Sequence, residues 1–382
     1  MDLRYGMNPH QRARIVDGSD RHVRVLHGSA SMINYLDALN AWQLVAEARR
    51  ATGKVAAASF KHVSPAGAAV AGMLDETMCE TWGLGTAGLG PVAAAYVRAR
   101  DADPRSSFGD LIAVSDPVDD ELADLLATVV SDGIIAPGYA PGTVAKLARK
   151  KRGRFLVVDI DPDFRPPATE IRTVFGVAIE QDHDREPITA ELLHPVGEPK
   201  LSDSSTTDAL LGMITARFTQ SNTVVLVRDG MTVGVGAGQQ SRIDCTHLAG
   251  AKARTWWMRR HHNIQTLPLP TDLPRQQRLN WQIALAAGTL TTRETGELTD
   301  LLTRPGTPIE ERDRTEWARG LTGLTMVSDG YLPFRDNVDA AAAFGVSVIV
   351  EPTGALQHDT IAAACRDHHI SLTRTDLRMF HH

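Results

Sequence analysis

Residues 119–160 contain the pattern that decides the fold: DDELADLLATVV at 119–130 runs into SDGIIAPGY at 131–139, and RFLVVDI follows at 154–160. The first stretch has the apolar spacing of an amphipathic helix, and the last is a short apolar run typical of a buried strand. The same order occurs earlier, where MINYLDALNAWQLVAEA at 32–48 predicts a helix and KVAAASF at 54–60 a strand. Helices that alternate with short apolar strands predict a layered α/β protein.

The length and composition favour two domains in a soluble protein. The chain has 382 residues, too many for one ordinary core, with 43% hydrophobic and 23% charged residues. Proline and acidic residues concentrate after residue 160, so we expect a first domain over 1–165, a connector over 166–200 and a second domain over 201–382. The two domains would then be near-equal halves.

Charge, cysteine content and hydropathy exclude several classes of protein. A formal charge of −6 argues against a nucleic-acid partner. The three cysteines, Cys79, Cys245 and Cys365, form no CxxC pair, so we expect buried, reduced side chains with neither a disulfide nor a thiolate metal site. No apolar run is long enough for a membrane span, and the N-terminus has no signal core. We therefore expect a cytoplasmic protein without a membrane partner.

A weak internal repeat predicts that the two halves are related by duplication. SDGIIAPGY at 131–139 is similar to SDGYLPFRD at 328–336, and each is flanked by helix and strand patterns in the same order. In the second half, NTVVLVRDGMTVGVGAG at 222–238 predicts a hairpin that turns at Asp229-Gly230 and leads into a helix. Its glycines do not complete GxGxxG, which disfavours a dinucleotide site.

The stretch SFKHVSPAG at 59–67 is the first candidate for chemistry. Lys61 and His62 stand side by side where a buried strand ends, and we expect Ser64-Pro65 to form the turn that ends it. A cation beside an imidazole can supply both charge stabilisation and a proton acceptor. The alternative, a surface lysine beside a capping histidine, stays open from this stretch alone.

Seven stretches occur in order over nearly the whole chain: LRYGMNPHQ at 3–11, DALNAWQLV at 37–45, SFKHVSPAG at 59–67, TQSNTVV at 219–225, GAGQQSRIDCTHLAGAKA at 236–253, PFRDNVD at 333–339 and LRMFHH at 377–382. Together they resemble one family, the transformylase of purine synthesis, which formylates aminoimidazole carboxamide ribonucleotide (AICAR) with 10-formyltetrahydrofolate. The common member of this family also carries an N-terminal cyclohydrolase domain, which we expect to be absent here. The resemblance implies two cytidine-deaminase-like α/β domains related by duplication. A zinc deaminase shares that fold, but the sequence lacks its HxE and PCxxC motifs.

The resemblance also implies the roles of individual residues. His62 would be the general base, Lys61 would stabilise the tetrahedral intermediate or assist the leaving folate nitrogen, and Asn222 would contact the formyl group or orient His62. The implied nucleotide ligands are Arg4, Tyr5, Asn34, Phe108, Gly109, Asp132, Asn280 and Arg378, of which Arg4 and Arg378 would bind the phosphate and Asp132 the ribose. The implied folate ligands are Arg242, Tyr331, Pro333 and Asp336. Without the resemblance, Asp336 and Arg335 would be expected to form a surface ion pair.

Partners and substrate follow by the same implication. Members of the family are homodimers with active sites shared between subunits, use no catalytic metal, and are expected to hold a structural monovalent cation (K+). Asp376 stands where the family pattern has Asn, so formyl transfer to an analogous aminoazole carboxamide ribonucleotide in nucleoside natural-product synthesis is an alternative. A non-catalytic nucleotide-binding relative is a third possibility, against which Lys61, His62 and Asn222 all argue.

Overall fold

The alternation predicted for residues 119–160 is present in the computed structural model, which describes residues 2–16, 18–85, 88–197 and 200–382. Helix α4 begins after Asp119, whose side chain accepts a hydrogen bond from the Leu122 N–H, and it buries Leu122 and Leu126. The elements of the first half are β1 Val23–His27, α1 Met32–Thr52, β2 Ala56–Lys61, β3 Ser64–Val70, α2 Glu76–Trp82, α3 Pro91–Asp101, β4 Asp110–Val114, α4 Asp120–Ala127, β5 Ser131–Ala136, α5 Thr143–Ala148, the 3-10 helix η1 Lys150–Arg152 and β6 Leu156–Ile160. The α/β fold class is confirmed.

The second half repeats this mixture of strands and helices after an exposed hairpin. Its elements are β7 Thr169–Val174, β8 Val177–Asp182, the 3-10 helix η2 Ala190–Leu192, β9 His194–Pro195, α6 Asp203–Arg217, β10 Thr223–Arg228, β11 Met231–Ala237, α7 Arg242–Met258, α8 His262–Gln265, α9 Arg275–Ala287, α10 Thr292–Leu301, α11 Glu311–Ala318, β12 Leu324–Ser328, α12 Asp336–Ala343, β13 Val346–Pro352, α13 His358–Asp367 and β14 Ser371–Thr375. Within the described ranges, no helix is both long and apolar enough to cross a membrane.

Strands from both halves join in one 12-stranded mixed sheet, in the order β1-β6-β5-β4-β2-β3-β11-β10-β12-β13-β14-β9. Read outward from the centre, the first half runs β3, β2, β4, β5, β6, β1 and the second β11, β10, β12, β13, β14, β9. Each pair of neighbouring strands in the first half is parallel or antiparallel as the matching pair in the second half is. A duplication would leave this arrangement, and the duplication itself stays a prediction.

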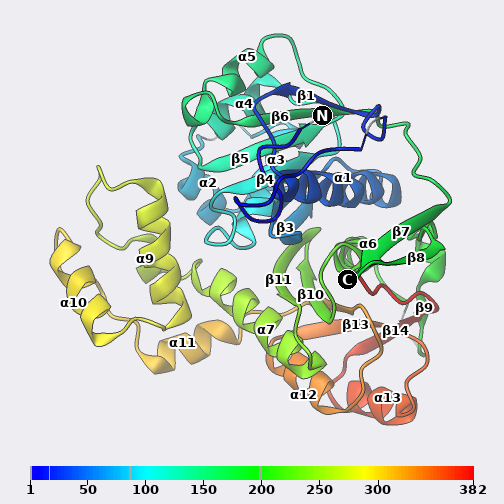
Figure 1. The fold of residues 1–382 in the computed structure, drawn as a ribbon. Helices are drawn as coiled ribbons and strands as arrows, with labels where there is room; N and C mark the ends of the chain where they lie inside the picture. The colour runs from blue at the N-terminus through cyan, green and yellow to red at the C-terminus, as the bar shows by residue number, and fades with distance from the viewer. Residues whose placement is uncertain (1, 17, 86–87, 198–199) are drawn as a thin grey trace.

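Helices cover both faces of the sheet and enclose two cores (Figure 1). On one face, α1 and α6 pack side by side and contribute Leu44, Val45, Leu211 and Ile214. On the other, α3 and α7 lie over the central hairpins and contribute Tyr96 and Cys245 among others. Cys245 and Cys365 are buried as expected, whereas Cys79 is partly exposed, and all three are free.

The repeated SDG tripeptide does not occupy matching positions in the two halves. Ser131 begins β5, whereas Ser328 ends β12. By sheet order β12 matches β4, and the match of β5 is β13. The expectation that this sequence echo marks equivalent places is therefore wrong, because Ser-Asp-Gly suits either end of a buried strand.

Both central hairpins turn through residues with positive φ. The predicted Asp229-Gly230 turn is confirmed, with φ of 52° and 74°. In the first half the loop is His62-Val63, with φ of 55° and 59°, and Lys61 pairs with Ser64. The expectation that Ser64-Pro65 forms the turn is wrong: those residues already belong to β3, because the chain reverses one step earlier through the left-handed conformation that such tight hairpin loops require.

Two parts of the structure, an exposed hairpin and a group of helices, were not predicted from the sequence. The expected connector contains the antiparallel hairpin β7–β8, which forms its own 2-stranded sheet and is exposed at every position. Helices α8 to α11 are inserted between α7 and β12, pack on two small cores of their own, and extend to one side of the sheet (Figure 1).

Candidate functional site

The tip of the β2–β3 hairpin places Lys61 and His62 beside a buried carboxyl group. Lys61 Nζ donates to the carbonyl oxygen of Phe108 at 2.7 Å. The Val63 N–H donates to Asp37 Oδ1 at 2.6 Å, from helix α1. Burial raises the pKa of Asp37, and the Val63 hydrogen bond and nearby His62 offset part of that rise. The strand end therefore presents an exposed imidazole, an anchored ammonium group and a carboxyl group together.

The N-terminal segment brings three predicted nucleotide ligands into contact. Arg4 Nη2 lies 3.3 Å from the Tyr5 hydroxyl and 3.5 Å from Asn34 Oδ1. The segment lies along the start of α1, because the Arg4 backbone N–H donates to the Ala30 carbonyl and the Met32 N–H donates to the Tyr5 carbonyl. Asn34 Oδ1 also accepts from the Ser31 N–H in the capping box of α1. Arg4 itself is exposed and can still reach an anion.

Gly109 and Asp132 meet where β4 and β5 begin. Gly109 has a φ of +78°, and a Cβ placed there would lie 3.7 Å from Asp132 Oδ1. Asp132 pairs with Lys151 of η1, a contact that sequence reasoning missed. Phe108 is 41% exposed beside them. The structure thus brings Lys61, Phe108, Gly109 and Asp132 to one end of the first-half strands.

A second cluster surrounds Asn222 at the start of β10. Asn222 Oδ1 accepts from Arg242 Nη2 at 2.8 Å, and its Nδ2 donates to the carbonyl of Gln239 at 3.0 Å. Arg242 is buried and also pairs with Asp329, which accepts from Ser221 Oγ at 2.6 Å. Asp329 was not predicted as a site residue, although it lies in the second SDG tripeptide, whose sequence was the only available signal.

The C-terminal segment runs beside this second cluster. The Met379 N–H donates to the Asp329 carbonyl at 2.9 Å, and the His381 N–H donates to Ser221 Oγ at 3.0 Å. Arg378 directly precedes the anchored Met379, with its guanidinium 4.5 Å from the centre of the Phe380 ring. The predicted phosphate ligand Arg378 therefore lies on the same side of the molecule as Asn222 and Arg242.

The predicted folate ligands follow strand β12. Tyr331 is 46% exposed, Pro333 is half-buried, and Asp336 begins helix α12 and accepts from Asn337 Nδ2 at 2.8 Å. The alternative ion pair between Arg335 and Asp336 is wrong. Arg335 pairs instead with Asp339 at 3.2 Å and Asp367 at 2.7 Å, because these carboxylates lie one helical turn on and on the neighbouring helix.

Several predicted residues are not brought together within the chain. Asn280 lies on α9 in the helical insertion, where its Oδ1 accepts from Gln276 Nε2 at 3.1 Å. Among the residues that the structure describes, no hydrogen bond or ion pair joins Asn280 to either cluster, or links the Lys61 cluster to the Asn222 cluster directly.

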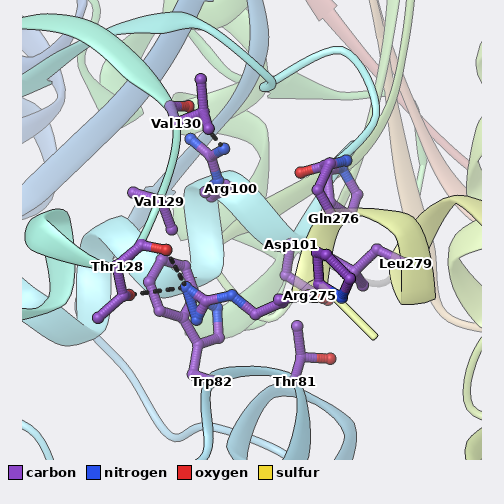
Figure 2. Close-up of a pocket in the computed structure, with 12 residues that line it drawn as sticks. Thr81, Trp82, Arg100, Asp101, Thr128, Val129, Val130, Arg275, Gln276 and Leu279 are labelled. Carbon is purple, nitrogen blue, oxygen red and sulfur yellow. Dashed lines mark hydrogen bonds between the residues drawn. The ribbon is translucent and has the colours of Figure 1, made fainter. Parts of the chain in front are cut away.

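Two hollows in the described part of the chain lie away from these clusters. A cavity of about 190 Å³ lies between α2, α3 and α9 and includes Trp82, Arg100, Val130 and Arg275 in its walls (Figure 2). A groove of about 940 Å³ lies at the other end of the strands, around Val70, Gly230 and Trp257. Neither is lined by a predicted site residue. Within the described ranges there is also no group of three or more His, Cys, Asp or Glu side chains that could share a metal ion.

Comparison with known proteins gives a consistent result. A family model described as AICARFT/IMPCHase bienzyme matches residues 1–252. Curated relatives from Roseobacter denitrificans, Ruegeria pomeroyi and Cereibacter sphaeroides, each called bifunctional purine biosynthesis protein PurH, are 30%, 30% and 31% identical over 388 aligned positions. The alignments cover 100% of this chain and 59% of each relative, so the chain spans about three fifths of their length.

Proposed function

The chain belongs to the AICARFT/IMPCHase bienzyme family, and from this premise we propose that it is a folate-dependent formyltransferase of purine biosynthesis. It would transfer the formyl group of 10-formyltetrahydrofolate to the 5-amino group of AICAR, giving formyl-AICAR and tetrahydrofolate. The observation that carries the proposal is the Lys61-His62 pair at the hairpin tip, with Lys61 fixed on the Phe108 carbonyl.

The amine of AICAR is a poor nucleophile because its lone pair is delocalised into the ring and the carboxamide. A base at that nitrogen and positive charge near the formyl oxygen are therefore what the reaction needs most. His62 is exposed at the hairpin tip, where its imidazole can reach the amine of a bound substrate. Lys61 supplies the positive charge at a position fixed by its hydrogen bond.

Asn222 would contact the formyl group or His62 with a side chain that is already held in place. Arg242 donates to its Oδ1 at 2.8 Å, and its Nδ2 donates to the carbonyls of Gln239 at 3.0 Å and Gln240 at 3.2 Å, so a hydrogen bond to the formyl oxygen would replace one of these. Fixing an amide in this way lowers the entropy lost when substrate binds. Arg242 would at the same time place a positive charge beside the folate.

Substrate binding is proposed to divide between the clusters. Arg4 and Arg378 would hold the phosphate, for which the fork of donors on guanidinium is well suited. Tyr5, Asn34, Phe108, Gly109 and Asp132 would surround the nucleoside, with Asp132 on the ribose diol and released from Lys151. Tyr331 would stack on the pterin, Pro333 would shape the wall, and Asp336 would accept hydrogen bonds from it.

We propose that the active unit is a homodimer in which each site combines residues of both subunits. Among the residues that the structure describes, no hydrogen bond or ion pair joins the Lys61 and Asn222 clusters of one chain, and Asn280 lies on the helical insertion. A second copy could bring Asn280 and the Asn222 cluster to the first copy's Lys61. No residue is assigned to a structural K+, and no step of the proposed reaction depends on a metal.

Formyl transfer to an analogous aminoazole carboxamide ribonucleotide is the alternative, and its motivation was Asp376. This residue is exposed and accepts a hydrogen bond from Thr353 Oγ1 at 3.3 Å. Its hydrogen-bond and ion-pair partners in the described structure, Thr353 and His194, are not candidate site residues. We therefore keep AICAR as the proposed substrate.

The test is a formyl-transfer assay with the purified chain, AICAR and 10-formyltetrahydrofolate, following tetrahydrofolate and formyl-AICAR. His62→Ala should lower kcat by roughly 100-fold to 10,000-fold, as expected for loss of a positioned general base, with AICAR affinity changed far less. His358→Ala, an exposed histidine on α13, serves as the matched control and should leave kcat unchanged. Turnover of another aminoazole ribonucleotide but not AICAR would establish the alternative, and no turnover of either would overturn the proposal.

A further inference from the structure

The loop that carries Phe108 and Gly109 has little regular backbone structure to hold it. Residues 102–109 form neither helix nor strand. The β4–β5 ladder that follows has a register shift between Asp110 and Leu111. Turn hydrogen bonds from the Ser107 N–H to the Asp103 carbonyl at 3.0 Å and from the Asp110 N–H to the Ser107 carbonyl at 3.2 Å order the loop locally. Its position relative to β2 and β5 depends in addition on side-chain contacts with those strands.

A buried network of polar side chains occupies that place, with Arg100 of α3 at its centre. Arg100 Nη1 donates to Asp110 Oδ1 at 2.8 Å and to the Tyr96 hydroxyl at 3.0 Å, and Nη2 donates to the Val130 carbonyl at 3.1 Å. The second Asp110 oxygen accepts from Ser59 Oγ at 2.7 Å. Arg100 is only 5% exposed, and Asp110 and Ser59 are fully buried.

The Asp110, Ser59 and Val130 branches of this network each end next to a proposed substrate-contacting residue. Ser59 precedes Lys61 on β2, and Asp110 directly follows Gly109. The Val130 carbonyl that accepts from Arg100 also accepts from the Gly109 N–H at 3.0 Å, just before Asp132. Ser59 Oγ lies 2.8 Å from Ser107 Oγ, the residue before Phe108. One guanidinium is thus connected to all three segments of the Lys61 cluster.

Stability alone does not explain a buried ion pair at this place. Desolvation of two buried charges offsets most of their attraction, so apolar residues of similar volume are often as stabilising. What the guanidinium adds is geometry, because its donors lie in a fixed plane and can hold a carboxylate, a hydroxyl and a carbonyl at once. Lysine carries the same charge but has no such fork.

The other side of the Thr128–Val130 segment is held by the helical insertion. Figure 2 shows Arg100 reaching the Val130 carbonyl and Arg275 of α9 reaching Thr128 across the small cavity. Arg275 Nη2 donates to Thr128 Oγ1 at 2.8 Å, and its guanidinium lies 4.6 Å from the Trp82 ring centre. The segment leading to Asp132 is therefore fixed from two directions.

We propose that Arg100 is a positioning residue for nucleotide binding: through Asp110, Val130 and Ser59 it sets the places of Phe108, Gly109, Asp132 and Lys61. This inference rests on the proposed function for the identity of the nucleotide. Arg100 does not touch the substrate and acts only through the segments that it holds.

The decisive comparison is Arg100→Lys against Arg98→Lys. Arg98 lies on the same helix and is equally buried, but it donates to the carbonyls of Asp229 and Met73 at the other end of the strands. Arg100→Lys should raise the KM for AICAR by roughly 10-fold or more, as expected for lost charged hydrogen bonds, with the KM for 10-formyltetrahydrofolate nearly unchanged. Arg98→Lys should leave both KM values unchanged. A variant that is only partly folded has a smaller active fraction, which lowers the apparent kcat. It does not raise the KM for AICAR while leaving the KM for 10-formyltetrahydrofolate unchanged.

Ser59→Ala gives a second reading with less risk to folding, since it removes one hydroxyl group. It should raise the KM for AICAR by a smaller factor than Arg100→Lys. The proposal would be overturned if Arg100→Lys and Ser59→Ala both fold and both have the wild-type KM for AICAR. If Arg100→Lys does not fold, a wild-type KM for AICAR in Ser59→Ala would overturn it alone.

Failure of the proposed function would be visible separately, as wild-type protein that neither binds nor converts AICAR. In that case amide hydrogen exchange over residues 104–110 decides the inference. Arg100→Lys should accelerate exchange there and Arg98→Lys should not. Equal exchange in the two variants would show that Arg100 does not position the loop.

Discussion

At the scale of single residues, the candidate chemistry depends on a backbone conformation that the sequence did not reveal. Val63 has a φ of 59°, which is unfavourable for a β-branched residue, and Asp37 accepts its N–H at 2.6 Å. Ser64, Pro65 and Gly67 are typical turn residues, so local preference favoured a later turn. The position of Lys61 at a strand end was predictable from the sequence. The hydrogen bond from the Val63 N–H to Asp37 was not, because Asp37 lies on helix α1, far from Val63 in sequence.

The role of Lys61 can be tested by a substitution that keeps its charge. Lys61→Arg should lower kcat by roughly 10-fold or more, because guanidinium is larger and stays protonated, and so cannot replace a compact group that donates a proton. It also cannot reproduce the single hydrogen bond from Nζ to the Phe108 carbonyl without moving one of them. Steady-state kinetics with AICAR measure the effect. A variant with wild-type kcat would restrict Lys61 to a purely electrostatic role.

At the scale of elements, both central hairpins need support for their tight loops. In β10–β11, Asp208 of α6 provides it: Oδ1 accepts from the Gly230 N–H at 2.6 Å and Oδ2 from the Asp229 N–H at 3.1 Å. In the β2–β3 loop, Asp37 of α1 accepts a hydrogen bond from the Val63 N–H, again from a helix that packs on that face of the sheet. Each hairpin loop is therefore held by a buried carboxyl group from the α1/α6 layer.

Burial of Asp208 has a consequence for stability against pH. Its pKa is raised to about 6 from 3.8, mainly by desolvation, with the backbone hydrogen bonds opposing the rise. The folded state therefore binds the proton more tightly than the unfolded state. The resulting contribution is fully present below the unfolded pKa, and is lost as pH rises through about 6.

We expect the free energy of unfolding of wild type, relative to Asp208→Asn, to fall by roughly 2 kcal/mol between pH 4 and pH 7. Urea denaturation at several pH values measures this difference, and Asp182→Asn, at an exposed position on β8, is the control that should show no such trend. A difference between wild type and Asp208→Asn that does not vary with pH would mean that Asp208 titrates alike in both states.

Apart from α9, which buries Leu279, Gln282, Ile283 and Ala286, the elements that sequence reasoning did not place bury few or no side chains. The β7–β8 hairpin is exposed throughout, so it lacks the one-sided burial that identifies a strand, and its proline-rich and acidic surroundings indicated only a connector. Helix α11 buries no residue fully, and α10 buries only Leu298. By contrast, β4, β6 and β10, with almost every residue buried, are among the most apolar stretches of the chain.

At the scale of the whole molecule, the two halves are joined by more than the central strands. Asp101 at the end of α3 pairs with Arg259 at 2.9 Å and Arg260 at 2.7 Å beyond the end of α7, and accepts from Trp256 Nε1 at 3.0 Å. The pKa of Asp101 is lowered because these guanidinium groups outweigh its burial. This cluster spans residues far apart in sequence, and no local pattern predicts it.

The proposal of a shared active site makes a prediction for mixed dimers. The two candidate clusters lie in different halves, and no hydrogen bond or ion pair of the described residues joins them within one chain. If each site takes Lys61 and His62 from one subunit and Asn222 from the other, a His62→Ala subunit paired with an Asn222→Ala subunit forms one site with both defects and one intact site. Co-refolded mixtures of the two inactive variants should therefore recover up to about a quarter of wild-type activity, since half of randomly paired dimers are mixed and each has one intact site.

The control is a mixture of His62→Ala with Lys61→Ala, whose defects fall on the same side of the proposed site and leave no intact site in any dimer. Differently tagged subunits, purified in sequence, show that mixed dimers are present. Absence of recovery in such purified heterodimers would mean that one chain supplies all three residues. The gap between the Lys61 and Asn222 clusters would then have to close by a movement within the chain.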